Sequence, residues 1–485
     1  MDNPALRGND YGPLQRPGDD WTPRLTVSVV IPAHGHQHKL DVTLAALAAQ
    51  TYPAALFETV VVDDGSDPAL RLPDLRPDNT RIVAPLPGGW ASAHATNSGA
   101  AQSDGDVILR LDADMLAFDD HVASQLRWHH TADYLAVMGH KRFVDYHEGD
   151  LDPAAVYDAV KAGKAADLYD TERSEPQWTE QIIDAAAGLR QADHRAFRVL
   201  VGASFSLHRS LFDASGGMDA DVLLGSDTIF GYRLHQAGAV FVPDDRSSAW
   251  HLGPRQIAER GALAKAYRRP RIAGRVPELD LKRPRAARLW PTPLADVVID
   301  AGTTPDPDLE STVDTLLTGT APDIRVTLTG DWPAPHTGRH PMLDDPDLPA
   351  RLLLETYSGE PRVRFTDAFQ PDPEVPYTMR MPAAARPGPD TVTAVIAYAN
   401  RHRLGLVEAA TPEGLVTLER TAAAARAAHL DVSIEKVWGS ARLAGPLTEA
   451  FAGSGTAGSG TGDARSGQRG LRGKARRVLR RMLGH

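Results

Sequence analysis

The sequence contains no cysteine among its 485 residues. Disulfides, thiol nucleophiles and zinc or iron–sulfur sites built on cysteine are therefore excluded. It also lacks an excess of basic residues, because 52 Lys and Arg stand against 63 Asp and Glu and leave a net charge of −11. An acidic chain of this kind disfavours a nucleic-acid-binding protein, so no nucleic-acid partner is expected.

Long apolar runs are missing as well. No stretch reaches the roughly 18 apolar residues that a membrane-spanning helix needs. Residues 1–24 are rich in Pro, Gly and Asp and have neither the apolar core nor the basic start of a signal peptide, so we expect a flexible lead-in. These absences favour a cytoplasmic protein, and the length favours about two to four domains.

Short apolar strands alternate with amphipathic helices over residues 25–255. The pattern predicts strands at 25–31 (ended by Pro32), 59–62, 106–111, 201–209 and 240–242, and helices at 38–50 and 227–236. Strand–helix–strand alternation is typical of an α/β fold with a parallel sheet. Ligands of such sheets bind beyond the carboxyl ends of the strands.

Acidic motifs stand at two of these strand ends. Residues 63–66 (Asp-Asp-Gly-Ser) follow the strand at 59–62, and residues 112–114 (Asp-Ala-Asp) follow the strand at 106–111. Paired carboxylates can hold Mg²⁺ or Mn²⁺ together with substrate phosphates. Taken alone, each motif is more often an ordinary polar turn or surface feature than a binding site.

Two further candidates lie near the end of this region. Asp227 follows Ser226 at the start of a predicted helix, where an acid is either a helix cap or a general base. His251 lies just beyond the strand at 240–242, where a histidine is either a structural hydrogen-bonding group or a metal ligand.

In this order and on this strand pattern, the motifs resemble glycosyltransferase family 2, enzymes of the GT-A fold. The resemblance covers residues 25–255 and rests on VSVVIPAHGHQHKLDVTLAALAAQTYP with VVVDDGS, on HATNSGAAQSDGDVILRLDADM and on GASFSLHRSLFDASGGMDADVLLGSDTIFGYRLHQAG. The last stretch also resembles the carboxyl-terminal segment of galactosyltransferase-like proteins. A Rossmann-like, mixed but mainly parallel α/β catalytic domain is the fold that the resemblance implies.

The resemblance also implies residues that bind the nucleotide-sugar donor. Asp63 or Asp64 would hold the nucleobase, usually uracil, with Pro32 and Ala33 lining its slot. Asn97 belongs to the same donor-binding set, although Thr96 stands before it where the family often has Arg.

A metal centre and a base complete the implied site. Asp112 would contact the donor ribose or the metal, Asp114 would bind the metal, and His251 would complete its coordination. Asp227 would be the general base, although Ser226 precedes it where the family usually has Glu.

These roles predict a metal-dependent, inverting glycosyltransferase that uses Mn²⁺ or Mg²⁺. Its donor would be a UDP-sugar, and its acceptor a growing cell-surface polysaccharide or a lipid-linked intermediate. One alternative is a non-catalytic glycan- or nucleotide-binding relative, favoured by Ser226. Another is a nucleotidyltransferase, which would need a Gly-rich, basic phosphate-binding loop that the N-terminal region does not supply.

The second half repeats the first faintly. After a basic linker or arm at 256–291, residues 292–450 contain the stretches 297–299, 325–332, 378–392 and 415–424, which line up with 29–31, 58–65, 108–122 and 205–214. In this copy Pro382-Ala383-Ala384 replaces Asp-Ala-Asp, and Thr329-Gly330 replaces Asp-Asp. We expect a degenerate GT-A-like domain kept for architecture, acceptor holding or dimerisation, with a second active transferase as the alternative.

Residues 451–485 read as a Gly/Ser/Thr linker followed by a basic tail. In residues 465–485 apolar side chains share one helical face and arginines surround it. This pattern predicts peripheral contact with the inner face of the cell membrane, with a basic tail of no specific role as the alternative.

Overall fold

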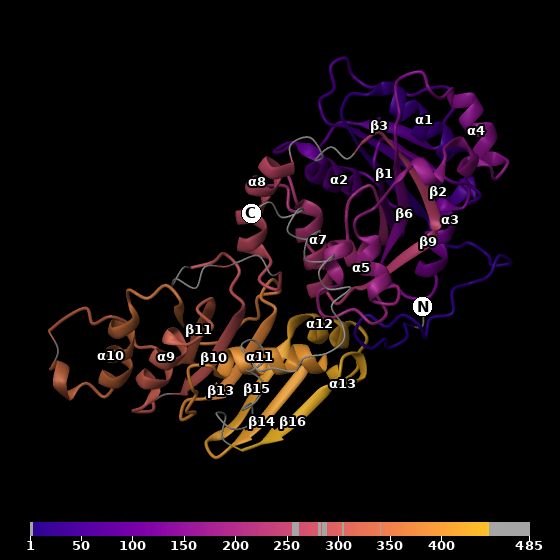
Figure 1. Ribbon diagram of the computed structural model, residues 1–485. Coiled ribbons are helices and arrows are strands. Elements are labelled where there is room, and N and C mark those ends of the chain that lie inside the picture. The colour runs from indigo at the N-terminus through magenta and orange to yellow at the C-terminus, as the bar shows by residue number, and fades with distance from the viewer. Residues whose placement is uncertain are drawn as a thin grey trace, which may run out of the picture.

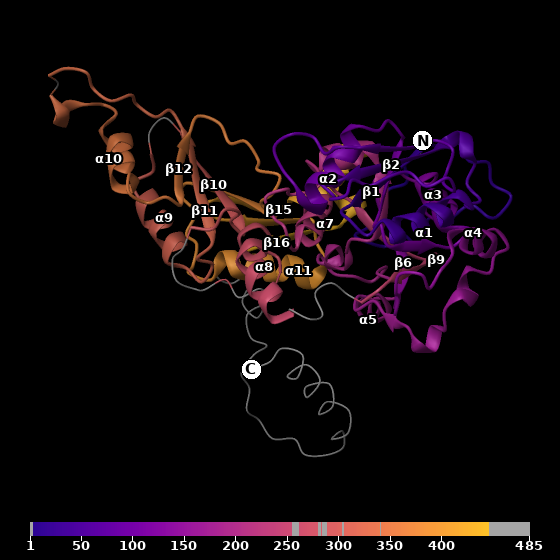
Figure 2. The same ribbon diagram turned by 90° about the horizontal axis from the view of Figure 1, so that it is seen from above.

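The computed structural model describes residues 3–254, 261–279, 283, 289–302, 305–339 and 341–445. These residues form two α/β units, each built on its own sheet, which lie side by side (Figure 1). Seen from above, the second unit extends away from the first, with α10 at its far end (Figure 2). The expected α/β class is confirmed.

A mixed sheet forms the centre of the first unit. Four parallel strands lie at one end, in the order β3, β2, β1, β4, and β8 and β6 follow as antiparallel neighbours before β9 and β5. The mainly parallel sheet expected of a GT-A domain is thus confirmed. The strand bounds are β1 Val27–Ala33, β2 Phe57–Asp63, β3 Thr80–Val83, β4 Val107–Leu111, β5 Met115–Ala117, β6 Leu135–Val144, β7 Glu175–Pro176, β8 Ser204–His208 and β9 Val240–Leu252.

Helices cover both faces of this sheet because its strands are apolar on both sides. Val29 and Leu109 face a layer that contains α1 and α3, whereas Val30 and Ile108 face a layer that contains α2 and α7. The helix bounds are α1 Gln37–Ala48, α2 Ala91–Ala101, α3 His121–His129, α4 Pro153–Lys161, α5 Glu180–Ala185, α6 Arg209–Ala214, α7 Ser226–Gln236 and α8 Gly261–Arg275.

Two of the differences from the predicted strand boundaries concern residues of the candidate site. Strand β1 continues through Pro32 to Ala33, because β4 pairs with β1 only as far as Val30 and the missing N–H of proline can face the free side. Strand β9 has 13 residues and includes His251, whereas only 240–242 was predicted. A bulge after Asp244 interrupts the register of β9 with β6. The residues of this bulge are polar, so the sequence pattern did not show that the strand continues.

The second unit repeats the strand order of the first. Its sheet runs β12, β11, β10, β13, β15, β14, β16, with the same parallel and antiparallel pairings as β3, β2, β1, β4, β8, β6, β9. The strand bounds are β10 Ala295–Gly302, β11 Ile324–Gly330, β12 Val363–Thr366, β13 Tyr377–Pro382, β14 Leu406–Thr411, β15 Gly414–Arg420 and β16 Ser440–Ala444. The helices are α9 Leu309–Thr318, α10 Leu348–Tyr357, α11 Thr391–His402, α12 Thr421–His429 and α13 Ile434–Val437.

Strand register corrects two parts of the proposed repeat. The pairings of β10 with β11 and β13 agree with the aligned stretches of the two halves. In this register Gly330 and Asp331 take the places of Asp63 and Asp64, so the assignment of Thr329-Gly330 to these positions was wrong by one residue. In the last strand, however, Arg420 lies opposite Tyr377 just as His208 lies opposite Val107. The alignment of 415–424 with 205–214 was therefore wrong by two residues, because the apolar pattern of one short strand does not fix its register.

Buried contacts join the two units where α12 approaches α7. The guanidinium of Arg426 on α12 is buried and donates to the carbonyl oxygens of Gly238 and Ala239 at 2.7 and 2.9 Å. It also donates to the carbonyl of Leu6 at 3.2 Å, so the N-terminal segment lies at the same junction. Residues 3–24, expected as a flexible lead-in, contain no helix or strand, but Leu6 and Asn9 within them are buried.

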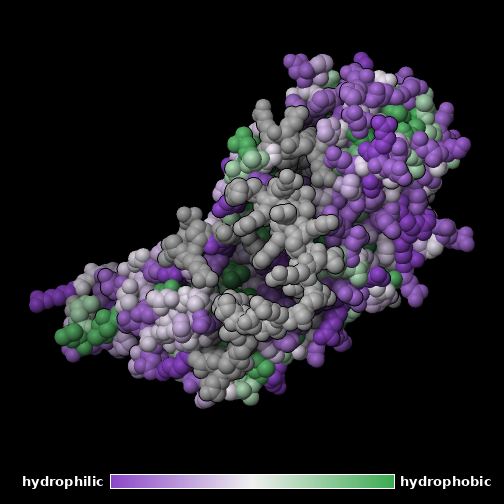
Figure 3. All heavy atoms as spheres, viewed as in Figure 1, coloured by the Kyte–Doolittle hydropathy of each residue, from purple (hydrophilic) through white to green (hydrophobic). Residues whose placement is uncertain are grey.

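The surface seen in Figure 3 is mostly hydrophilic, with small, scattered hydrophobic patches. One of them lies at the α10 end of the second unit, where Met342, Leu343 and Leu352 are exposed. None of the helices in the described ranges is long and apolar enough to pass through a membrane. The tail at 465–485, for which membrane contact was predicted, lies outside the described residues.

Candidate metal and donor site

Three side chains with metal-binding atoms meet at the carboxyl end of β4. Asp112 follows β4, and Asp114 precedes β5, which turns back and pairs with β9. That pairing sets Met115 opposite His251, and the N–H of Leu252 donates to the carbonyl oxygen of Asp114 at 2.8 Å. The short strand β5 and the long strand β9 thus bring His251 to the Asp-Ala-Asp turn from far along the chain.

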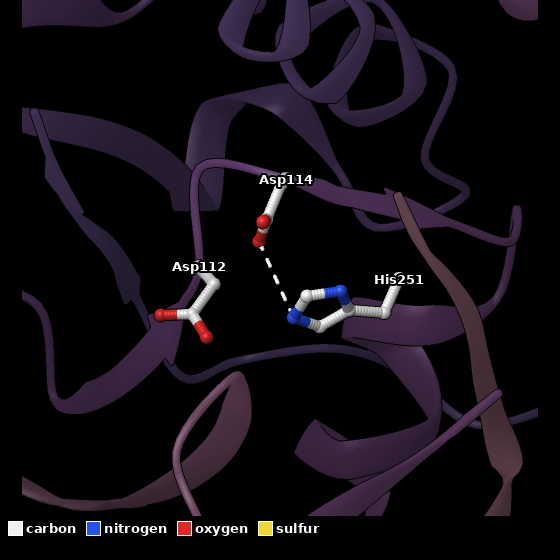
Figure 4. A group of neighbouring side chains, drawn as sticks. All are labelled: Asp112, Asp114 and His251. Atoms are coloured by element: carbon white, nitrogen blue, oxygen red, sulfur yellow. Dashed lines mark ion pairs between the residues drawn. The ribbon is translucent and has the colours of Figure 1, made fainter. Parts of the chain in front are cut away.

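The geometry of this trio fits a divalent cation. Each residue offers one ligand atom, and these atoms all lie within 4.8 Å of one another. Asp114 and His251 point toward each other, with 3.5 Å between Oδ1 and Nε2, and Asp112 approaches from the side (Figure 4). Two carboxylates and an imidazole are a donor set that suits Mn²⁺ and also Mg²⁺, which prefers oxygen.

The surroundings of Asp114 disfavour its ionised form, and a bound cation would favour it. Burial is the largest cause that raises the pKa of its carboxyl, and the neighbouring Asp112 raises it further. His251 and the Lys39 ammonium act in the opposite direction. A bound cation would add positive charge beside this carboxylate and would favour its ionised form.

Two basic side chains flank the acidic pair. Nζ of Lys39, on α1, lies 3.5 Å from Oδ2 of Asp114 and donates to the carbonyl oxygen of Leu252 at 2.6 Å. Nη2 of Arg110, inside β4, lies 2.7 Å from Oδ1 of Asp112. Positive charge is therefore already present where a diphosphate would approach the acidic pair.

The two acids after β2 have different surroundings. Asp63 accepts the N–H groups of Ser66 and Leu70 at 2.9 and 3.0 Å and closes the turn that follows the strand. Burial raises the pKa of Asp63, but these hydrogen bonds and that of the Ser66 side chain outweigh burial and leave the pKa below its ordinary value. Asp64 accepts only the N–H of Ala91, at 2.7 Å through Oδ2, among the described residues. Of the two, Asp64 is therefore the one with a free carboxylate oxygen.

The other donor-binding candidates lie on β1 and α2. Pro32 is half-buried at the end of β1, and Ala33 is buried, with its carbonyl accepting the N–H of Asp64 at 2.8 Å. Asn97 on α2 uses both ends of its amide on the backbone of Met218, at 2.8 and 2.9 Å. The side chain of Asn97 thus positions the loop before α7. Each end of its amide keeps one further hydrogen-bonding position, so its contact with the donor stays a prediction.

Asp227 lies in the first turn of α7, whose preceding residue Gly225 has a φ of 93°. A Cβ there would approach a side-chain carbon of Ile272 to 2.9 Å, so both conformation and space call for glycine. A helix start favours a carboxylate electrostatically, through the unpaired N–H groups of the first turn. A Cβ added at Gly202 would lie 3.2 Å from Oδ2 of Asp227 and 2.8 Å from Nη1 of Arg110. The predicted base thus faces the arginine that pairs with Asp112.

Sequence reasoning missed the basic residues of the site. Arg110 carried a usable signal, because a charge inside the apolar run DVILRL is buried in a central strand and needs a partner. Lys39 carried none, since a lysine in the first turn of an amphipathic helix is ordinary. Gly202 could not be recognised either, because its importance lies in the atoms that crowd it.

Part of the first unit matches a known family. Residues 28–197 match Glycosyl transferase family 2. The hyaluronan synthase of Pasteurella multocida is 25% identical over 369 residues, 70% of this chain and 35% of that protein. The chondroitin synthase of Pasteurella multocida strain Pm70 is 24% identical over 356 residues, with the same coverage of 70% and 35%. The chain thus spans about a third of the length of these two relatives.

Among solved structures, a mannosyltransferase from Pyrobaculum calidifontis in complex with GDP-Man and Mn²⁺ aligns with 19% identity and a TM-score of 0.36. The alignment covers 54% of this chain and 67% of that one, and a similarity this low supports no inference about the chain. The family match, by contrast, spans β1, β2 and β4 with both of their acidic motifs. Residues 28–197 of the chain are thus similar to glycosyltransferase family 2.

Proposed function

We propose that the chain is a metal-dependent, inverting glycosyltransferase that moves a sugar from a nucleotide-sugar donor to a hydroxyl group. The observation that carries the proposal is the trio of Asp112, Asp114 and His251 at the carboxyl end of β4. Asp227 lies near Arg110, the partner of Asp112, and this supports its proposed role as the base. Both groups are what sugar transfer from a diphosphate requires.

The residues divide the chemistry among them. Asp112, Asp114 and His251 hold a divalent cation, which neutralises the diphosphate leaving group when it is bound. Asp64 receives the nucleobase of a UDP-sugar through its free carboxylate oxygen. Asp227 accepts the proton of the attacking hydroxyl. Because one attack displaces the diphosphate directly, the configuration at the anomeric carbon inverts.

Glycans or lipid-linked intermediates are the acceptors that we propose, by analogy with relatives whose names are polysaccharide synthases. The second unit serves architecture rather than transfer. Its β13 ends at Pro382 and is followed by Ala383-Ala384 where β4 is followed by Asp-Ala-Asp, so this turn supplies no carboxylate for a cation. Its β11 ends at Gly330 and is followed by Asp331, which takes the place of Asp64 and is the one acid of the two motifs that the second unit keeps.

Turnover of a panel of UDP-sugars with Mn²⁺, followed as released UDP, tests the proposal. We expect Asp227→Asn to lower kcat by about 100-fold or more, as the loss of a general base does, while UDP binding persists. Asp114→Ala should abolish both turnover and metal-dependent binding.

The alternative is a non-catalytic nucleotide- or glycan-binding protein, for which Ser226 in place of Glu is the supporting observation. Binding of UDP without release of UDP from any donor, in wild type and Asp227→Asn alike, would favour that alternative. Co-sedimentation with phosphatidylserine vesicles, with and without residues 465–485, tests the proposed peripheral membrane contact. Equal partitioning of the chains with and without residues 465–485 would contradict the proposed membrane contact.

A further inference from the structure

A cavity lies at the junction of the two units, and none of the metal or donor candidates lines it. Its volume of about 30 Å³ gives room for about two or three water molecules or for a small oxyanion. The N-terminal segment, the segment between α5 and β8, helix α7 and the second unit all form parts of its wall. The charged and titratable residues of this wall are Asp193, His194, His235, Arg403, Arg420 and Arg426.

Positive charge is in excess around this junction cavity. Arg420 is buried but pairs with Glu278 at 3.0 Å, and Asp193 pairs with Arg195 at 2.9 Å. Arg426 is equally buried, and within the described ranges its guanidinium donates to backbone carbonyl groups and pairs with no carboxylate. Burial lowers the pKa of Arg426 to about 10, so this side chain stays charged at neutral pH. A buried cation without a counter-ion is costly.

Two histidines of the wall have ring nitrogens without a hydrogen-bond partner. Nδ1 of His194 and Nε2 of His235 are buried and bond to nothing in the part of the chain that the structure describes. Glu278 lies 3.9 Å from Nε2 of His194 and 4.0 Å from Nε2 of His235, which is too far for a hydrogen bond. His235, in the last turn of α7, is only 3% exposed. Each imidazole can therefore give an N–H to an acceptor in the cavity.

We propose that the junction cavity binds a small oxyanion of the size of phosphate, between Arg403 and Arg426 of the second unit and His235 of the first. The anion is the counter-ion that Arg426 lacks, and it accepts N–H groups that the chain leaves unpaired. Arg403 is exposed at the end of α11 and carries a further positive charge to the cavity wall. A metal cation does not suit the cavity, because the arginines repel it.

A ligand in this position contacts both units. The arginines of its site come from the second unit and His235 comes from α7, so binding favours the joined arrangement over the unfolded chain. The inference requires nothing of the transfer reaction, and it stands or falls independently of the function proposed above.

Inorganic phosphate is the probe, added to the full chain in EDTA, with sodium chloride at the same pH and ionic strength as the reference. We expect one phosphate per chain by calorimetry. At ten times its Kd, phosphate should raise Tm by about 3–6 °C more than chloride does. His235→Phe keeps an aromatic ring without a donor and should weaken the Kd by about tenfold or more, as the loss of a hydrogen bond to a charged group does.

Arg403→Gln removes an exposed charge of the wall without disturbing the core, so it decides the test even if His235→Phe does not fold. It should weaken the Kd by about threefold or more. Arg401→Gln is the matched control, because Arg401 is exposed on the same helix and is not part of the cavity wall. Equal Kd values in Arg401→Gln and Arg403→Gln overturn the inference, since only the general charge of the surface would then attract the ion.

Lys39→Gln distinguishes the junction cavity from the donor site, where phosphate could also bind. We expect it to leave the Kd at the wild-type value. A Kd that weakens in Lys39→Gln but not in Arg403→Gln places the phosphate at the donor site and overturns the inference. A Tm that rises equally with phosphate and with chloride does so too, because the cavity would then hold water only.

Discussion

Replacing Asp114 by asparagine should stabilise the metal-free protein and abolish its response to metal. The carboxylate of Asp114 is largely buried next to Asp112, and burial raises its pKa, so its charge costs folding free energy when no cation is bound. Asparagine keeps the shape and removes the charge. We expect a gain of about 1 kcal/mol, typical of substitutions that relieve a strained functional site. For a domain of this size that gain raises Tm by about 2–4 °C.

With Mn²⁺ bound, wild type should be more stable than Asp114→Asn. Mn²⁺ at a hundred times its Kd stabilises wild type by about 2.7 kcal/mol through mass action, which corresponds to a rise in Tm of about 5–10 °C. Asp114→Asn loses a ligand of the trio and should show no such rise. Thermal unfolding in EDTA and in a Mn²⁺ series measures both effects in one experiment.

The control is Asp78→Asn, which removes an exposed carboxylate outside the site. It should change neither Tm in EDTA nor the response to Mn²⁺. A variant Asp114→Asn that is less stable than wild type in EDTA, or that keeps the full rise with Mn²⁺, would refute the reasoning. The carboxylate would then be a structural group and the trio would not be a cation site.

Three further predictions concern stability. Burial lowers the pKa of His121 to about 4. Below about pH 6.5 the folded state therefore binds fewer protons than the unfolded state, and the free energy of unfolding falls by about 2 kcal/mol by pH 5. Urea titrations at pH 7.5 and 5 should show a smaller fall in His121→Gln, and an equal fall would contradict this prediction. Arg426→Met leaves the carbonyl groups that accept from its guanidinium without a hydrogen-bond donor, so it should lower the free energy of unfolding in urea by about 3 kcal/mol or more. A loss below about 1 kcal/mol would mean that the junction tolerates these unpaired carbonyl groups. Ala203 has a φ of 83°, so Ala203→Gly should raise the free energy of unfolding by about 0.5–1 kcal/mol, and a clear loss would show that the conformation is not strained.

Much of the fold followed from the sequence because the central strands are uniformly apolar. The strands that became β1, β2 and β4 stood out as β-branched runs, and parallel strands place their carboxyl ends at one edge. The two acidic motifs could therefore be assigned to one edge of the sheet from the sequence alone. The repeat in the second unit was visible for the same reason, although one strand was two residues out of register.

The rest depended on contacts between distant segments. The position of His251 comes from β9, whose bulge breaks the alternation that would have revealed the strand. Asp63 and Asp64 could not be ranked, because the hydrogen bonds that occupy Asp63 come from a turn. The hydrogen bonds of Asn97 to the backbone of Met218 were not expected, and its contact with the donor stays a prediction. The local sequence pattern does not predict which hydrogen-bond partner a polar side chain has in the folded protein.

Calorimetric titration of UDP into the full chain, with and without Mn²⁺, tests the central claim most directly. We predict one UDP bound per chain, dependent on the metal, and a loss of affinity of at least about tenfold in both Asp64→Ala and Asp114→Ala. Two UDP molecules per chain would mean that the second unit also binds nucleotide. Affinity that is indifferent to Mn²⁺ and to both substitutions would contradict the claim that these strand-end carboxylates form one donor site.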